Sequence, residues 1–459
     1  MPATSTLAGD LGEFLASATL ADVPGHVRER LRDDVVDLAG CAVFGLRTPW
    51  GQAVAEHVAA QEERPDASVW GTTTRASAGG AALALGTLGH SFDFDDYHAE
   101  AKLHPATVVV PAALALGESL HSTGERVLLA TALGFETMIR LALASGPVPT
   151  MLNGFHLTGI CGSVGAAAAA ASVLQLDART TAHALGLAAT QSAGLMGFLH
   201  DGSETKRLHA GKAAQSGILA AQLAARGLTG PARVFELEHG GFCHAFGVEP
   251  HPARLVEELG QRWHAGDVSF KRYSCCGSIH STLDLVSDAI RQLAVEPGDI
   301  DEIEVRHSPA VIAQCGWTYE PSDVLHAQMS IQYCVAVLLL EGAVLPEQFR
   351  RAMLDDPAVL QLAARVRCTP DDDVAQKYPA KFASRVVVRA GGAEADLRTD
   401  HPKGAPENAL TGTEVDEKFL RLTQDGLSKE QQRRFLENAR RLDRLGDVAS
   451  LVADLRIDG

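Results

Sequence analysis

The sequence predicts a mainly α fold: a large all-helical domain formed by both chain ends, with a smaller inserted α+β unit. Three observations support this. Ala, Leu and Gly are abundant, whereas aromatic residues make up 5% of the chain, which favours closely packed helices over a β-sandwich. Apolar residues recur at helical spacing through the first two-thirds of the chain, and alternating patterns begin near Val268. A length of 459 residues exceeds one ordinary hydrophobic core, so more than one domain is expected.

Helices are expected wherever apolar residues recur every three or four positions. Pro24 lies just ahead of one such pattern and Gly227 just after another, as is common at helix starts and ends. In chain order, the helices expected in the first two-thirds are 7–18, 26–44, 52–63, 76–88, 105–120, 123–144, 159–176, 177–194 and 210–226.

A compact α+β unit is expected between residues 266 and 402. Residues 300–306, IDEIEVR, alternate as a strand does, and Gly391-Gly392 between two such runs is a hairpin signal. The expected elements are extended segments at 268–273, 300–306, 366–369, 384–390 and 393–399, helices at 278–293 and 324–340, and one or two helices within 345–364. Helices at 413–422, 429–442 and 448–455 should pack back on the first domain. The predicted boundaries are therefore 1–265, 266–402 and 403–459.

Composition excludes several classes of function. The formal charge of −17 argues against nucleic acid and against an anionic membrane surface as partners. No apolar run is expected to be long enough to span a membrane, and the N-terminal residues lack a basic start and apolar core. None of the eight cysteines forms a C-x-x-C pair, and no P-loop or H-E-x-x-H occurs. We expect a cytoplasmic protein with reduced thiols and no metal.

Residues 89–105, GHSFDFDDYHAEAKLHP, concentrate ionisable side chains between two apolar helices. Such groups are costly to bury unless they are paired or used, although a solvated loop is the alternative. The string that starts at Asp93, DFDD, could bind a divalent cation or act as a general acid. A carboxylate that orients a histidine or caps a helix is favoured. Pro105 holds His104 in an extended conformation, which suits its imidazole to proton transfer near neutral pH.

Three further positions place basic side chains in small or apolar sequence. His156 precedes a glycine-rich helix start, where a hydrogen-bonded core histidine is the alternative. Lys206 lies near a helix entrance, where the helix dipole does not favour a cation, so an anionic partner is expected. The alternative is an exposed lysine. The run KRYSCCGSIH, from Lys271 to His280, leads into another helix. Cys276 and His280 could form a nucleophile pair there, but a buried structural cysteine is favoured.

Five stretches of the chain form a set that spans nearly its whole length. In order, they are HSFDFDDYHAEAKLHPATVVVPAALALGE, FHLTGICGSVGAAAAAASVL, KRLHAGKAAQSGILAAQLAARGLTGP, KRYSCCGSIHSTLD and HPKGAPENALTGTEVDEKF. Taken together, they resemble the MmgE/PrpD family, which includes 2-methylcitrate dehydratases, cis-aconitate decarboxylases and an iminodisuccinate epimerase. They occur in the family's order, which makes the set more specific than any single stretch.

This resemblance implies a helical domain from both chain ends, an inserted α+β lid domain and a homodimer. It also implies a site in the cleft between the domains that uses no metal and no organic cofactor. Matching motif positions place the family's site residues on Asp93, His104, His156, Lys206 and Lys271, and a lid tyrosine of the family on Tyr319.

The substrates that the resemblance implies are small di- or tricarboxylates. Lys206 and Lys271, beside Arg207 and Arg272, can offset two or three carboxylate charges, and His280 is a further candidate for substrate binding. Fixed cations stabilise the charge that develops when a proton next to a carboxylate is removed.

The same residues suggest a division of labour in proton transfer. We expect His104 or His156 to move the carbon proton and Asp93 to orient a histidine. A positioned base contributes roughly 10²–10⁴-fold to such a reaction. Lys271 and Tyr319 would hold a carboxylate or protonate the departing group.

The leading hypothesis is a cofactor-independent hydro-lyase like 2-methylcitrate dehydratase. An epimerase or isomerase like iminodisuccinate epimerase, and a decarboxylase like cis-aconitate decarboxylase, are the alternatives, because the same groups can direct a proton to either face or follow the loss of CO2. A helical dimer that binds a metabolite without turnover is the non-enzymatic alternative.

Overall fold

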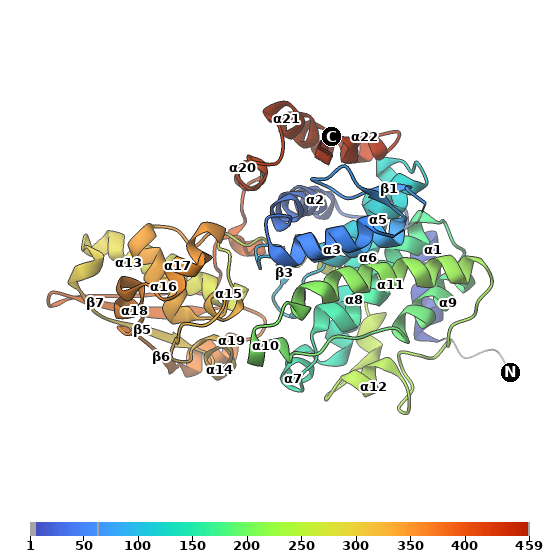
Figure 1. Ribbon diagram of the computed structural model, residues 1–459. Coiled ribbons are helices and arrows are strands. Elements are labelled where there is room, and N and C mark those ends of the chain that lie inside the picture. The colour runs from blue at the N-terminus through green and yellow to red at the C-terminus, as the bar shows by residue number, and fades with distance from the viewer. Residues whose placement is uncertain (1–5, 62–63, 458–459) are drawn as a thin grey trace.

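The computed structural model describes residues 6–61 and 64–457, and its fold is mainly α, as predicted. Side chains gather into two large hydrophobic cores. One core contains residues from 8–270 and from 415–455, and the other contains residues from 273–395 together with Phe198. Figure 1 shows the two bodies side by side, with the C-terminal helices lying on the helical body. We call these bodies the helical domain and the lid.

Helices account for nearly all of the helical domain, and two pairs of two-residue strands accompany them. The pairs are β1 (Ala67–Ser68) with β2 (Arg75–Ala76) and β3 (Tyr97–His98) with β4 (Val268–Ser269). The helices are α1 (Leu7–Ser17), α2 (Gly25–Gly45), α3 (Pro49–Ala59), α4 (Ala78–Gly89), α5 (Ala106–Ser119), α6 (Gly124–Ser145), α7 (Pro147–Leu152), α8 (Leu157–Val173), α9 (Ala178–Ala189), α10 (Phe198–Asp201), α11 (Thr205–Ala225), α12 (Phe242–Phe246), α20 (Gly412–Thr423), α21 (Lys429–Arg440) and α22 (Ala449–Val452).

Helix α6 corrects one expectation from the sequence. Its 22 residues are long and apolar enough to cross a membrane, although no such segment was expected. The whole apolar window is buried, and the helix packs on α5 and α8. The helix is therefore apolar because it lies at the centre of the core.

Small residues let the core helices approach closely. A Cβ added at Gly86 of α4 would lie 2.7 Å from the Cα of Gly211 on α11 and 2.8 Å from the carbonyl oxygen of Thr107. Both neighbours are backbone atoms, which cannot move aside as a flexible side chain can. The two helices therefore cross at a point where glycine is required.

We expect Gly86→Ala to lower the free energy of unfolding by about 1–3 kcal/mol through overpacking. Gly79→Ala on the same helix is the matched control, because its added Cβ would meet only a side-chain atom of Gln215, at 3.7 Å. The control should be neutral or gain up to about 1 kcal/mol from helix propensity. Urea denaturation of the two variants measures the difference, and equal effects would show that the crossing is not tight.

The lid combines a four-stranded sheet with short helices. Its strand order is β6-β5-β7-β8, with β5 parallel to β6 and the other neighbours antiparallel. The strands are β5 (Ile300–His307), β6 (Val366–Pro370), β7 (Ser384–Ala390) and β8 (Ala393–Thr399). The helices are α13 (His280–Leu293), α14 (Pro309–Cys315), α15 (Val324–Gln328), α16 (Ile331–Glu341), α17 (Arg351–Leu354), α18 (Pro357–Ala363) and α19 (Asp372–Lys377).

The hairpin predicted from Gly391-Gly392 is confirmed. The two glycines form the whole connection between β7 and β8, with φ of 55° and 80°. Positive φ at both central residues is the geometry that suits a two-residue hairpin to the twist of its strands.

The single helix predicted over 324–340 is wrong, because α15 and α16 are separate. The buried Ser330 lies between them, and its hydroxyl accepts the backbone N–H of Tyr333 at 3.2 Å, capping α16. An apolar run on both sides hides such a cap from a periodicity argument.

The C-terminal helices pack back on the helical domain, where α20 and α21 contact α2. Lys418 of α20 makes an ion pair with Asp37 of α2 at 2.7 Å. The same ammonium group donates to the backbone carbonyl oxygens of Phe94 and Lys271, at 2.5 and 3.1 Å. The C-terminal segment thus holds two chain segments that carry sequence-predicted site residues.

Candidate active site

A cavity of about 80 Å³ lies between the helical domain and the lid. Five of the residues predicted from the family resemblance line it: Asp93, His104, His156, Lys206 and Lys271. They come from the loop after α4, the starts of α8 and α11, and the chain after β4. Pairing of β3 with β4 brings the first loop and the last segment together.

Helix α11 begins at Thr205, earlier than the predicted start at residue 210. Lys206 therefore lies in its first turn, where the helix dipole does not favour a cation. The anionic partner expected from the sequence is present, because Nζ of Lys206 lies 2.6 Å from Oδ1 of Asp93.

Asp93 connects the two active-site lysines. The same Oδ1 accepts a hydrogen bond from Nζ of Lys271 at 2.8 Å, and the Asp93 carbonyl oxygen accepts another at 3.1 Å. Burial alone would raise the pKa of Asp93, but the ammonium groups of Lys206 and Lys271 hold it well below its usual range. This arrangement corrects the expectation that Asp93 orients a histidine. The three side chains together carry one net positive charge.

Asp95, two residues later, is the carboxylate that orients His104. Nδ1 of His104 lies 2.8 Å from Oδ2 of Asp95 and 2.7 Å from the carbonyl oxygen of Asp96. Both oxygens are acceptors, so Nδ1 carries the proton and Nε2 is the basic atom of the neutral ring. His90 also places its Nδ1 against Asp95, at 3.0 Å. Burial would raise the pKa of Asp95, but these rings and Lys271 hold it well below its usual range.

The third carboxylate of the string caps a helix. Oδ2 of Asp96 accepts the backbone N–H of Ala106, in the first turn of α5, at 3.0 Å. Burial and the neighbouring Asp95 raise the pKa of Asp96 well above its usual range. The string therefore combines histidine orientation with helix capping, and its carboxylates do not share one cation site.

His156 precedes the first residue of α8 and faces a second histidine. Its Nδ1 lies 3.0 Å from Nδ1 of His209, so one of the two rings donates to the other. Burial and the neighbouring His209 hold the pKa of His156 well below its usual range. The ring is therefore neutral near pH 7.

Tyr319 and Arg207 lie outside the cavity-lining set of the described residues. The hydroxyl of Tyr319 donates to the carbonyl oxygen of Leu354 inside the lid, at 3.0 Å. Arg207 donates from Nε to the carbonyl oxygen of Ser91 at 3.0 Å, and its guanidinium lies over the ring of Trp50. In this structure neither side chain is placed to contact a ligand next to Asp93.

Arg272 and His280 also lie outside the cavity-lining set of the described chain. Arg272 is half exposed and pairs with Asp284 at 3.3 Å. His280 is fully buried, with Nε2 3.4 Å from the carbonyl oxygen of Cys275. Their proximity to Lys271 in the sequence does not carry over to the cavity, because the chain bends at residues 272–275 and His280 already begins α13.

Two residues that the sequence reasoning did not single out belong to the site, because Asp95 orients His104 and Lys102 lines the cavity. Cys276, which the sequence analysis considered as a nucleophile with His280, lines the cavity and is half-buried. A hydrogen bond with Cys315 lowers the pKa of Cys276 to about 6. The density of ionisable groups in residues 89–105 was a signal for the first two, but it did not distinguish among its members.

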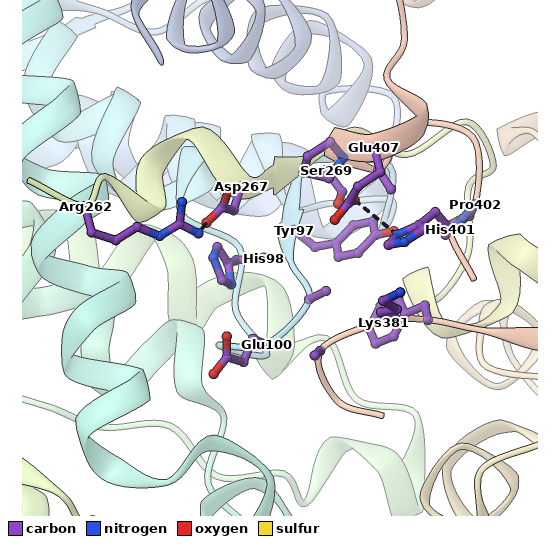
Figure 2. A pocket seen from close by; sticks show the side chains of 15 residues that line it. Tyr97, His98, Glu100, Arg262, Asp267, Ser269, Lys381, His401, Pro402 and Glu407 are labelled. Carbon is purple, nitrogen blue, oxygen red and sulfur yellow. Dashed lines mark hydrogen bonds and ion pairs between the residues drawn. The ribbon is translucent and has the colours of Figure 1, made fainter. Parts of the chain in front are cut away.

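A larger cavity, of about 170 Å³, is lined by Tyr97 and His98 of β3 (Figure 2). Its charged side chains pair with acidic neighbours: Arg262 with Asp267, Lys381 with Asp400 and His401 with Glu407. Figure 2 shows the first and the last of these pairs among the side chains that line the cavity. Because these charges are already neutralised, the smaller cavity is the better candidate for binding a multiply charged acid.

Two groups of the described residues bring three donor atoms within 4.8 Å of one another, as a metal site would need. They are His90, Asp95 and His104, and His98, His264 and Asp267. In the first group both rings hydrogen-bond to the carboxylate. In the second, Nδ1 of His98 accepts the backbone N–H of Ala101, which leaves the proton of the neutral ring on Nε2, where a metal would bind. Neither group has the hydrogen-bond pattern of a metal site.

Buried histidines should make the fold sensitive to acid. Burial lowers the pKa of His90 and His307 to about 4 and that of His98 and His280 to about 3. Each has an ordinary value of 6.5, so between pH 6.5 and about 4 the unfolded chain binds protons that the folded chain does not. The free energy of unfolding is therefore independent of these histidines above pH 6.5. Below pH 6.5 it falls by up to about 1.4 kcal/mol per pH unit for each histidine.

Urea denaturation at pH 7, 6 and 5 tests this expectation. The slope of the free energy of unfolding against pH reports how many protons the chain takes up when it unfolds. His280→Gln should lower that number by about one, whereas His57→Gln, at an exposed position, should leave it unchanged. A slope that is the same in the wild type and in His280→Gln would show that His280 is already protonated in the folded state.

Comparison with known proteins shows the family to which the chain belongs. The MmgE/PrpD N-terminal domain matches residues 9–253, and the MmgE/PrpD C-terminal domain matches residues 273–444. The chain is 30% identical to cis-aconitate decarboxylase-like protein oryM of Aspergillus oryzae, over 97% of this chain and 96% of that protein. It is 28% identical to cis-aconitate decarboxylase of Aspergillus terreus, covering 98% and 96%, and 27% identical to that of Homo sapiens, covering 97% and 94%. The chain therefore belongs to the MmgE/PrpD family.

Proposed function

We propose that this protein is a lyase that decarboxylates cis-aconitate or a closely related tricarboxylate without a cofactor. The observation that carries the proposal is the pairing of Asp95 with His104, which leaves Nε2 as the basic atom of a ring that lines a cavity with three lysines. Relatives named as cis-aconitate decarboxylases match nearly the whole chain, and they favour decarboxylation over the dehydration that the sequence first suggested.

The proposed reaction balances with the groups of this site. The bond between a carbon and its departing carboxylate breaks, and the electron pair becomes conjugated with the double bond and a remaining carboxylate. A proton then joins the far carbon of the former double bond. The products are CO2 and an unsaturated five-carbon dicarboxylate. Lysine ammonium groups stabilise the charge that develops during this shift.

His104 is the proposed proton donor. Once Nε2 has taken a proton, the carboxylate of Asp95 at Nδ1 stabilises the imidazolium and keeps its orientation. Lys206 and Lys271 retain further N–H donors beyond those used on Asp93, and these bind one substrate carboxylate. His156, which precedes α8 and also lines the cavity, is a neutral ring that would contact the substrate.

Proton NMR in D2O with purified protein tests the proposal. The substrates are cis-aconitate, 2-methylcitrate, citrate and the iminodisuccinate stereoisomers, each with wild type and with the exposed-site control His57→Gln. We expect cis-aconitate to disappear with one deuterium incorporated for each CO2 released. If 2-methylcitrate is dehydrated and cis-aconitate does not react, the protein is a hydro-lyase and the proposal is wrong. If iminodisuccinate exchanges deuterium without release of CO2 or water, the protein is an epimerase and the proposal is wrong.

A further inference from the structure

Lys102 lies in a hydrogen-bonded turn between β3 and His104. The backbone N–H of Lys102 donates to the carbonyl oxygen of His98 at 3.0 Å, and the N–H of His98 donates to that of Leu103 at 2.8 Å. Lys102 itself has φ of 55°, a left-handed conformation that is unfavourable for a residue with a Cβ. The turn therefore fixes the direction in which the side chain leaves the backbone.

The end of this side chain lies in an aromatic cage contributed by the lid. Nζ of Lys102 lies 3.9 Å from the ring centroid of Tyr378 and 4.1 Å from that of Phe382. Both residues lie between α19 and β7. The faces of two rings attract an ammonium group. They provide no anion to balance its charge.

Within the described residues, Nζ of Lys102 is buried and has no hydrogen-bond partner, although the side chain lines the cavity. Burial lowers the pKa of Lys102 well below its usual range. A buried polar group without a hydrogen-bond partner destabilises a fold. Its presence beside a cavity therefore points to a ligand that supplies the missing partner.

The charge of the cavity shows what such a ligand would be. Lys206 and Lys271 share the single carboxylate of Asp93 and so contribute one net positive charge. A tricarboxylate carries three negative charges near neutral pH. Among the cavity-lining residues that the structure describes, Lys102 is the lysine that no carboxylate neutralises.

We propose that Lys102 is a substrate-binding residue that takes a carboxylate other than the one bound by Lys206 and Lys271. This inference rests on the proposed function, because it assumes an acid with several carboxylates in this cavity. The substrate would then connect Lys206 and Lys271 with an amino group held against lid rings, and its carboxylate would favour the protonated form of that group. Binding energy would thus depend on contacts from both bodies.

Lys102→Met tests the proposal, because methionine keeps an unbranched apolar side chain against the rings and removes the charge. We expect KM for cis-aconitate to rise about 10- to 100-fold, with kcat changed less than about threefold, as for a lost hydrogen bond to a charged group. Tricarballylate, a saturated tricarboxylate that cannot lose CO2 by this route, should lose affinity by the same factor in calorimetry. Lys212→Met, at an exposed position of α11, is the matched control and should change neither value.

A second variant, Lys102→Gln, guards against a packing effect, because it also removes the charge but differs in shape; it should lose a similar factor. The inference is overturned if both variants bind tricarballylate as the wild type does, or if kcat falls while KM stays constant, which would indicate proton transfer. Calorimetry separates this inference from the proposed function. Wild type that binds tricarballylate through Lys102 but does not turn over cis-aconitate would overturn the proposed function alone.

Discussion

Asp93→Asn is expected to lower the free energy of unfolding by about 3–5 kcal/mol and to abolish turnover, because it leaves buried ammonium groups without their counter-ion. Lys271 is 1% exposed, and its Nζ has Asp93 as its ion-pair partner at 2.8 Å. Lys206 loses the same partner. The substitution keeps the shape of the side chain, so the effect reports the charge. Urea denaturation and turnover of cis-aconitate measure the two losses.

A double-mutant cycle shows whether the loss comes from the unpaired lysine. Asp93→Asn combined with Lys271→Met should be more stable than Asp93→Asn alone, because the second change removes a buried charge that has lost its partner. Asp425→Asn is the surface control, since Asp425 pairs with Arg47 where both side chains are more than half exposed, and it should cost less than about 1 kcal/mol. Additive effects at Asp93 and Lys271 would contradict the ion-pair explanation.

His104→Gln should reduce turnover by about 10²–10⁴-fold while the free energy of unfolding stays within about 1 kcal/mol of wild type. The side chain is 15% exposed and lines the cavity, so its removal does not empty the core. Steady-state kinetics with cis-aconitate, beside the His57→Gln control, measures the loss. Turnover within about threefold of wild type would transfer the proton donor's role to His156.

Asp95→Asn separates orientation from proton transfer. An asparagine amide can donate to Nδ1 of His104 and so favour the tautomer with the proton on Nε2, which removes the basic atom from the cavity. We expect turnover to fall nearly as far as in His104→Gln, although the histidine is still present. A variant that keeps most of its turnover would show that Asp95 only packs against the ring.

Local patterns predicted the elements that depend on near neighbours. The helix expected over 105–120 is α5, Ala106–Ser119, and the Gly391-Gly392 turn joins β7 to β8. Both follow from side-chain periodicity or from the backbone freedom of glycine, which operate over a few residues. The break at Ser330 was missed because one capping hydroxyl outweighed an apolar run on either side.

Partners in the site were harder to predict, because they come from distant parts of the chain. Asp93 and Asp95 are two residues apart, yet one binds Lys206 and Lys271 and the other binds His104. Asp93 has φ of 51°, and neither this left-handed turn nor the direction of each carboxylate follows from the spacing of acidic residues.

The amino-acid sequence by itself determined the mainly α fold, the family and the five residues that meet in the cavity. Periodicity and motif order are properties of the chain that need no partner from elsewhere. Only the tertiary structure decided which carboxylate serves the lysines and which serves the histidine. It also decided that Tyr319 faces the lid core. Lys102 lines the cavity, and its ammonium end lies against the rings of Tyr378 and Phe382. The physical reason is that charge pairing and burial depend on distances between segments far apart in sequence, which packing of the whole chain sets.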